Sequence, residues 1–323
     1  MDEFALIADL LAPLSRGEPG AFGLTDDAAL VDVSDGHQLV VTKDMLVAGV
    51  HFMADDAPDL VARKLLRVNL SDLAAMGATP KAYLVGLAAP RDVDDDWLRG
   101  FAGGLAEDQA AFSVTLIGGD TVSTEGPLTV SLTAFGEAPA GMALRRQGAK
   151  PGDGVFVSGS IGDSVLGLAV LKGGLDALDS DSRATLIDRY HLPRPRLELA
   201  ARLRDMAHAA IDVSDGLVAD LGHLCRVSGV GGDLDASRVP LSTAARAALA
   251  ADPALIDTVL TGGDDYELLF TASGGDAGRI AEMAADLSLP LTMIGQIIPG
   301  AGVTVRDSQN MPMNFKSTGW RHR

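Results

Sequence analysis

Strand-like and helix-like runs alternate in the N-terminal part of the chain, and this alternation restricts the fold more than any other feature. The predicted strands cover residues 37–47, 81–90, 113–121 and 128–138, and the predicted helices cover residues 59–77 and 92–112. Gly77 and Pro80 supply a stop after the first of these helices. Strands separated by helices in this way predict a sheet packed against helices, in an α/β or α+β arrangement.

A segment rich in proline, glycine and basic residues interrupts the pattern at 138–153 (APAGMALRRQGAKPGD). Beyond it, strand-like and helix-like runs alternate again up to the C-terminal region. The chain of 323 residues is long enough for two domains of ordinary size. We therefore expect one domain over residues 1–140 and a second over residues 141–323.

The chain is strongly acidic, with 44 acidic against 26 basic residues and a formal charge of −18. Such a surface repels phosphate backbones, which argues against nucleic acid as a partner, and an anionic substrate would need cations to screen it. The single cysteine, Cys225, excludes an internal disulfide and suits a reducing compartment. The N-terminal stretch lacks the basic region of a signal peptide, and no apolar run is long enough to span a bilayer. We expect a cytoplasmic protein that does not bind membranes.

One phrase occurs twice, as VDVSDG at 31–36 and IDVSDG at 211–216. The first copy precedes a strand-like run, and Asp-Gly before such a run predicts a hairpin turn. The second copy precedes LVADLGHLC, in which Leu217, Leu221 and Leu224 recur at helical spacing. Because α/β proteins place ligand groups where strands turn into helices, we interpret only the second copy as a candidate site.

Several aspartates lie at the ends of apolar runs: Asp26, Asp27, Asp44, Asp72, Asp120, Asp212 and Asp215. Asp72 is unusual because it shares a helix face with Leu65, Asn69 and Met76. A carboxylate on a packing face needs a partner, which is either an arginine or a metal ion. Clustered aspartates favour a hard cation with oxygen ligands, such as Mg²⁺, and zinc finds no ligand set.

The sequence Gly-Gly-Asp recurs, and the copies at 118–120 and 262–264 directly follow strand-like runs. Each of these is either a glycine turn with a solvated aspartate or part of a ligand site. His51 follows a strand-like run, and the pair Arg145–Arg146 either faces solvent or holds a phosphate. The chain contains no P-loop motif, and DVSDG does not complete a calcium-binding loop.

Seven stretches together resemble the thiamine-monophosphate kinase family, in the order in which that family carries them. They are DDAALV, KDMLVAGVHF, VNLSDLAAMGATP, LIGGDT, ALRRQGAKPGD, AIDVSDGLVADLGH and GGDDYELLF. The resemblance runs from about Phe4 to Trp320, and VNLSDLAAMGA and GGDDYEL are its most specific parts. The wider superfamily that this resemblance implies includes aminoimidazole ribonucleotide synthetase, and its members bind ATP.

The resemblance implies a two-domain, synthetase-like ATP-binding fold. Its N-terminal α/β domain binds ATP and Mg²⁺ and forms a homodimer through its sheet, and its C-terminal domain is α+β. The implied reaction moves the γ-phosphoryl group of ATP onto thiamine monophosphate, giving thiamine diphosphate and ADP. Several Mg²⁺ ions are implied as cofactors, and a monovalent cation is a further candidate.

The resemblance also assigns roles to single residues. The implied metal ligands or neighbours are Asp27, Thr42, Lys43, Asp44, Asp72, Asp120, Asp212 and Asp215. The implied ATP contacts are Gly119, Asp120, Arg146 and Ser214, and the implied thiamine contacts are His51, Asp264 and Trp320. Asp120, Arg146 and Asp212 are the expected catalytic residues. A phosphate oxygen is already a competent nucleophile, so no general base is expected.

Three positions depart from the family pattern. Thr25 stands where the family usually has glycine, and a positive φ there would cost on the order of 1–2 kcal/mol. Lys43 replaces a small hydroxyl residue, and we hypothesise that its ammonium group substitutes for one peripheral Mg²⁺. Asp264 stands where many relatives have glutamate. The alternatives to the kinase are another ATP-using enzyme of the superfamily and a non-catalytic nucleotide- or metal-binding relative.

Overall fold

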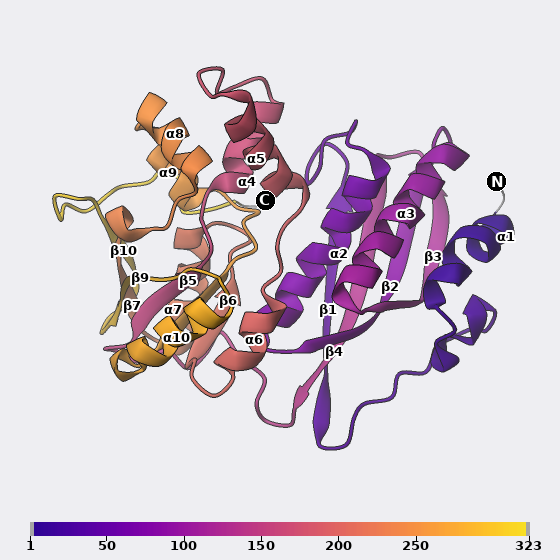
Figure 1. Ribbon diagram of the computed structural model, residues 1–323, viewed down its shortest axis with the longest axis horizontal. Coiled ribbons are helices and arrows are strands. Elements are labelled where there is room, and N and C mark those ends of the chain that lie inside the picture. The colour runs from indigo at the N-terminus through magenta and orange to yellow at the C-terminus, as the bar shows by residue number, and fades with distance from the viewer. Residues whose placement is uncertain (1–2, 321–323) are drawn as a thin grey trace. The chain divides into compact units, whose positions relative to one another are not determined.

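The computed structural model describes residues 3–320, which divide into two compact units (Figure 1). Unit 1 comprises Met1–Leu73 and Ala78–Gly141, and unit 2 comprises Ala74–Gly77 and Met142–Arg323. The main change of unit thus follows Gly141, one residue from the boundary expected after residue 140. The short piece 74–77 groups with unit 2 because Ala74 and Ala75 pack in the same core as Leu144 and Phe156.

Unit 1 is a four-stranded sheet with the strand order β1-β4-β2-β3. Its strands are β1 (His37–Val47), β2 (Thr79–Pro90), β3 (Thr115–Thr124) and β4 (Thr129–Pro139). Strand β4 runs antiparallel to both β1 and β2, and β3 runs parallel to β2. Helices α2 (Pro58–Ala75) and α3 (Asp95–Phe112) cover one face of this sheet (Figure 1). All of these elements were predicted from the sequence.

Short helical segments precede the sheet of unit 1: α1 (Glu3–Leu6), η1 (Ile7–Leu11), η2 (Ala12–Ser15) and η3 (Pro19–Leu24). After them, Asp35 and Gly36 form the expected turn, closed by the N–H of His37, which donates to the carbonyl of Ser34 at 3.0 Å. The predicted hairpin is wrong, however, because residues 25–34 form no strand. The Glu137 carboxylate instead accepts the N–H of Ser34 at 3.0 Å and its hydroxyl at 2.8 Å.

Unit 2 is built on a six-stranded mixed sheet with the order β10-β7-β9-β5-β8-β6. Its strands are β5 (Gly154–Ser158), β6 (Ala209–Asp212), β7 (Gly231–Asp235), β8 (Leu268–Ala272), β9 (Leu291–Ile298) and β10 (Gly302–Arg306). Its α-helices are α4 (Asp163–Leu171), α5 (Ser180–His191), α6 (Leu197–Leu203), α7 (Leu217–Ser228), α8 (Thr243–Ala251), α9 (Leu255–Thr261) and α10 (Ala277–Asp286), and its short turns are η4 (Ala236–Arg238) and η5 (Gly274–Asp276). The pairing is antiparallel except between β7 and β10, which makes this unit α+β as expected.

The Gly-Gly-Asp copies do not follow strands in the predicted way. Residues 118–120 lie inside β3, and residues 262–264 follow helix α9. The run before the second copy resembles a strand in sequence, because a short apolar run does not distinguish a strand from a buried helix. In the structure, Val259 and Leu260 are buried on α9.

The second IDVSDG copy lies between β6 and α7, so its predicted place between a strand and a helix is confirmed. Strand β6 ends at Asp212, and α7 begins at Leu217 and buries Leu217, Leu221 and Leu224 in the core of unit 2. Cys225 is buried in the same core. None of the helices within residues 3–320 is long and apolar enough to cross a membrane.

Candidate active site

The loop between β6 and α7 is held by a single buried carboxylate. The backbone N–H groups of Ser214, Asp215 and Gly216 all donate to Oδ2 of Asp220, at 3.0, 3.0 and 3.1 Å. Asp220 is only 2% exposed, and burial, followed by the charge of Asp215, raises its pKa to about 7. Gly216 has φ +127°, which favours glycine, and a Cβ there would lie 2.7 Å from the carbonyl oxygen of Thr261. Asp220 therefore fixes the conformation of this loop.

The carbonyl groups of the same loop hold two distant segments of unit 2. Each of three consecutive carbonyls accepts one backbone N–H: Val213 from Tyr266 at 2.8 Å, Ser214 from Asp264 at 2.9 Å, and Asp215 from Trp320 at 2.9 Å. The sequence motifs DVSDG and GGDDYEL and the C-terminal segment thus meet at one place. This brings together four of the residues singled out from the sequence: Ser214, Asp215, Asp264 and Trp320.

The GGDDYEL loop approaches its neighbour closely and with unusual backbone angles. A Cβ on Gly263 would lie 2.1 Å from the carbonyl oxygen of Ser214, so this contact requires glycine. Asp264 has φ +71° and Tyr266 has φ +51°. Aspartate enters this left-handed region more readily than most residues with longer side chains. The conformation therefore suits the aspartate found at position 264.

A cavity of about 410 Å³ opens beside the loop between β6 and α7. Asp215, His223, Arg226 and Trp320 are among the residues that line it. The pKa of His223 is lowered by burial and by the charges of Arg226 and Arg146, while Asp215 acts in the opposite direction. Arg146 therefore lies within electrostatic reach of the same cavity. His223 and Asp220 were not singled out from the sequence, although acidic residues in the first turn of a helix are a known signal.

Asp212 and Arg146 complete the candidate residues of unit 2. Asp212 ends strand β6 and is 2% exposed. Arg146 is exposed, and its carbonyl accepts a hydrogen bond from Ser228 Oγ at 3.2 Å. The backbone of Arg146 is therefore anchored to Ser228, the last residue of α7.

In unit 1, Thr42 and Asp44 of β1 face helix α2. Thr42 Oγ1 donates to Asp72 Oδ2 at 2.5 Å, and the N–H of Asp44 donates to Asn69 Oδ1 at 3.1 Å. Burial, and then the charge of Asp72, raise the pKa of Asp44 to about 7, while Lys43 opposes this shift. Two partly buried carboxylates that repel each other make a donor set that suits a divalent cation.

Lys43 lies on the opposite face of β1, because successive side chains of a strand alternate. It lines a cavity of about 860 Å³ in unit 1, together with Asp27, Gly119 and Asp120. Asp26 lines this cavity as well. The candidate metal residues of unit 1 thus form two groups, one on each face of the sheet. Thr25 has φ −111°, so the strain considered for a threonine at this position does not arise.

His51 lies four residues after the end of β1, and the backbone of Val47 holds its ring. Its Nδ1 accepts the N–H of Val47 at 3.1 Å, and its own N–H donates to the Val47 carbonyl at 3.0 Å. A backbone N–H can only donate, so Nδ1 is the acceptor and a neutral ring carries its proton on Nε2. His51 therefore presents a fixed N–H donor from Nε2.

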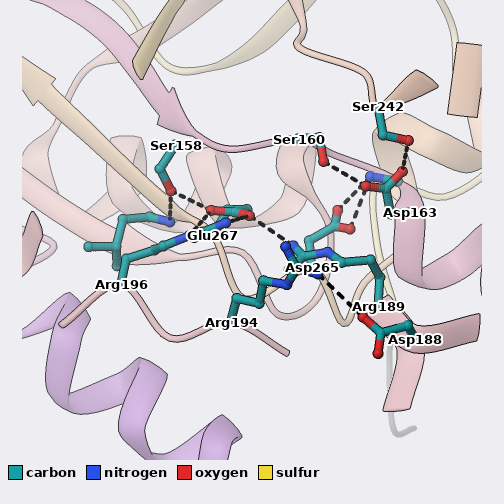
Figure 2. A network of polar contacts seen from close by, with 12 residues as sticks. Ser158, Ser160, Asp163, Asp188, Arg189, Arg194, Arg196, Ser242, Asp265 and Glu267 are labelled. Carbon is teal, nitrogen blue, oxygen red and sulfur yellow. Dashed lines mark hydrogen bonds and ion pairs between the residues drawn. The ribbon is translucent and has the colours of Figure 1, made fainter. Parts of the chain in front are cut away.

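The end of the GGDDYEL motif anchors a buried polar network (Figure 2). Glu267 is fully buried and accepts hydrogen bonds from Ser158 Oγ at 2.6 Å, Arg189 Nη2 at 2.8 Å and Arg196 Nε at 2.6 Å. The neighbouring carboxyl, Asp265, accepts the N–H of Gly162, and burial raises its pKa well above the usual range. Acids inside an apolar motif indicate such a network, because buried charges need partners.

Comparisons with known proteins place the chain in a family. The family described as "AIR synthase related protein, N-terminal domain" matches residues 25–138, and its C-terminal counterpart matches residues 150–308. A thiamine-monophosphate kinase of Caulobacter vibrioides is 44% identical over 99% of this chain and 90% of its own length. A thiamine-monophosphate kinase of Escherichia coli K12 is 41% identical over 99% of this chain and 98% of its own length.

Solved structures agree with these sequence relationships. The thiamine-monophosphate kinase of Stenotrophomonas maltophilia K279a superposes with a TM-score of 0.85 at 42% identity, covering 94% of this chain and 96% of its own. The structure described as "AaThiL complexed with AMPPCP and TMP" gives a TM-score of 0.79 at 31% identity, covering 95% and 98%. The hydrogenase maturation protein HypE, at 20% identity and a TM-score of 0.78, shares the fold. On its sequence identity and coverage, this chain belongs to the thiamine-monophosphate kinase family of AIR synthase related proteins.

Proposed function

We propose that this protein transfers the γ-phosphoryl group of ATP to thiamine monophosphate, which gives thiamine diphosphate and ADP. The observation that carries the proposal is the 44% identity over 99% of the chain with a thiamine-monophosphate kinase. The related structure that holds both AMPPCP and TMP supports it, because AMPPCP is an ATP analogue in which a methylene group replaces the oxygen that bridges the β- and γ-phosphates.

In unit 2, the loop fixed by Asp220 would present the nucleotide and metal contacts. We assign Ser214 to ATP, and Asp212 and Asp215 to Mg²⁺. The hydrogen bonds on both sides of the loop support this assignment, because preorganised groups lose little entropy when they bind. Arg146 would contribute a permanent positive charge to the transferring phosphoryl group.

In unit 1, we assign metal contacts to both groups of candidate residues. Thr42, Asp44 and Asp72 would hold Mg²⁺ on the α2 face, and Asp27 and Asp120 would do so in the cavity of the other face. Mg²⁺, when bound, supplies positive charge that screens and aligns the phosphate groups. We assign Gly119 to ATP on the family resemblance; a Cβ there would lie 2.1 Å from the Val85 carbonyl oxygen, so the packing of β3 on β2 requires glycine at this position.

Lys43 lies in the same cavity as Asp27 and Asp120, which supports the hypothesis that its ammonium group replaces one peripheral Mg²⁺. The variant Lys43→Ser should then bind one more divalent ion than the wild type in the presence of AMPPCP. Titration with Mn²⁺ followed by electron paramagnetic resonance counts these ions. Equal numbers in both proteins would contradict the hypothesis.

The thiamine substrate would contact His51, Asp264 and Trp320. The fixed Nε2–H of His51 is a hydrogen-bond donor that suits a phosphate or ring acceptor. The indole of Trp320 is half exposed and suits stacking on an aromatic cation. The acceptor phosphate oxygen attacks directly, so the residues of the chain bind, orient and neutralise, and none needs to remove a proton.

The test incubates the protein with thiamine monophosphate, ATP and Mg²⁺ and follows thiamine diphosphate and ADP by chromatography. Equal amounts of both products, lost on chelation of the metal, are expected. Asp212→Asn should abolish turnover, whereas Asp32→Asn, its counterpart in the exposed first copy of DVSDG, should leave it nearly unchanged. Binding of ATP without product would instead favour the non-catalytic relative.

A homodimer, a cytoplasmic location and a need for a monovalent cation stay predictions. Strand β1 is an edge strand, and Leu39, Val41 and Met45 on it are exposed by 39%, 53% and 53%, which supports a dimer through this sheet. Val41→Lys should shift the protein to monomers in light scattering coupled to size exclusion. A wild-type monomer at micromolar concentration would contradict the dimer.

A further inference from the structure

The C-terminal segment Ser317–Trp320 lies against the first turn of α7 with no room for a side chain on Gly319. A Cβ added to Gly319 would lie 2.4 Å from the Cβ of Ala219 and 2.8 Å from the carbonyl oxygen of Asp215. Outside its own residue and the two neighbouring residues, a real Cβ atom essentially never has a heavy atom within 3.0 Å, so one of the two segments would have to move. Gly319 is thus required by space.

In the same place, the C-terminal segment donates a hydrogen bond to the loop between β6 and α7. The N–H of Trp320 donates to the Asp215 carbonyl at 2.9 Å, and Ser317 Oγ closes the preceding turn on the Gly319 carbonyl at 2.7 Å. A segment displaced by a side chain on residue 319 would lose the first of these bonds. The loop itself would stay in place, because Asp220 holds its N–H groups independently.

The indole of Trp320 depends on this backbone placement. Trp320 is 54% exposed and lines the cavity of unit 2 together with Asp215 and His223. Its neighbours Thr318 and Gly319 line the same cavity. The backbone of residues 317–320 therefore carries the indole to the wall of this cavity.

We propose that Gly319 is a positioning residue: its missing side chain seats the C-terminal segment on the Asp215 loop and so places Trp320 for the aromatic part of the substrate. This inference rests on the proposed function. Gly319→Ala should raise the KM for thiamine monophosphate about tenfold, the scale of one lost hydrogen bond with its packing. The KM for ATP and kcat should change less than about twofold, because Asp220 holds the loop without help from Gly319.

Two variants of Ala219 test whether the change in KM comes from the contact between residues 319 and 219. Ala219→Gly removes the nearer obstacle, so the double variant Gly319→Ala/Ala219→Gly should recover part of the affinity for thiamine monophosphate. Ala219→Leu crowds the contact from the side of the helix and should raise the same KM without changing the C-terminal segment. Gly274→Ala is the matched control, since a Cβ at Gly274 would meet nothing within 4 Å.

A fluorescence readout tests the seating without turnover. The chain has two tryptophans, and Trp97→Phe leaves Trp320 as the only one. Trp97 stacks on Phe101 at 5.2 Å between ring centroids, so phenylalanine keeps an aromatic ring there. In this background, Gly319→Ala should shift the emission of Trp320 to longer wavelength and increase its quenching by acrylamide, and Gly274→Ala should do neither.

The outcomes separate the inference from the proposed function. A raised KM for thiamine monophosphate alone, relieved by Ala219→Gly, supports the positioning role. Wild-type KM values and wild-type fluorescence in Gly319→Ala, or equal losses in Gly274→Ala, overturn it. If the wild type forms no thiamine diphosphate, the proposed function is wrong, and the fluorescence comparison alone decides whether Gly319 seats Trp320.

Discussion

Replacement of Glu267 should destabilise unit 2 strongly, because this carboxylate is the shared partner of two arginines. Its side chain is fully buried, and those of Arg189 and Arg196 are only 6% and 18% exposed. Among the residues that the structure describes, Nη1 of Arg189 already has no hydrogen-bond partner. A neutral residue at position 267 would therefore leave a buried guanidinium group without its counter-charge.

The size of the loss follows from these contacts. Removing one partner of a buried ion pair costs about 3–5 kcal/mol. Gln at position 267 keeps one acceptor oxygen and the volume of the side chain, so Glu267→Gln should lie near the lower end, about 3 kcal/mol. Ala leaves a cavity and no acceptor, so Glu267→Ala should lie near the upper end, about 5 kcal/mol.

Urea unfolding followed by the fluorescence of Trp320 in the Trp97→Phe background measures the effect on unit 2. For a slope of about 2 kcal/mol per molar urea, a loss of 3 kcal/mol lowers the midpoint by about 1.5 M. Glu198→Gln on α6 is the matched control, because Glu198 is exposed. A midpoint for Glu267→Gln within about 0.3 M of that control would refute the reasoning, since water would then satisfy the two arginines.

Three further predictions concern single side chains. Asp220→Ala should lower kcat/KM for ATP about a hundredfold, because it leaves three backbone N–H groups without their acceptor. Asp220→Asn keeps an acceptor oxygen and should lower kcat/KM less, and steady-state kinetics with varied ATP compares the two variants. Burial raises the pKa of Cys225 to about 11, so its thiol should react with a disulfide reagent only after unfolding, and fast reaction of the native protein would contradict this. Hydrogen bonds from Ser34, and then the hydrogen bond and charge of Lys81, lower the pKa of Glu137 from 4.5 to about 2. The contribution of these contacts to the free energy of unfolding is present above pH 4.5 and disappears as the pH falls toward 2. Glu137→Gln should therefore flatten the acid limb of a plot of unfolding midpoint against pH.

Much of the fold was predictable because the relevant patterns are local. The periodicity of residues 37–47 and 59–77 predicted β1 and α2, whose observed bounds are His37–Val47 and Pro58–Ala75. The errors arose where the local pattern was ambiguous or a distant group intervened. The run ending at Thr261 is too short to separate a strand from a helix, and Glu137 takes the N–H that a hairpin would need.

The candidate site was predictable in part. The sequence pointed to Ser214 and Asp215 because they lie between a strand and a helix, and the structure adds Asp220, which holds their N–H groups. In the structure, the side chains of Lys43 and Asp44 lie on opposite faces of β1, although the two residues are adjacent in the chain. Motif similarity alone carries no information on which side of a sheet a residue lies.

The sequence by itself determined the alternation of strands and helices, the acidic character of the chain and the family to which it belongs, because these depend on local patterns and residue order. The tertiary structure alone decided that the carbonyls of Val213, Ser214 and Asp215 hold two distant segments, and that Gly319 must lack a side chain. Hydrogen bonds and close contacts between segments about fifty to a hundred residues apart depend on how the chain packs. No local periodicity encodes such distances.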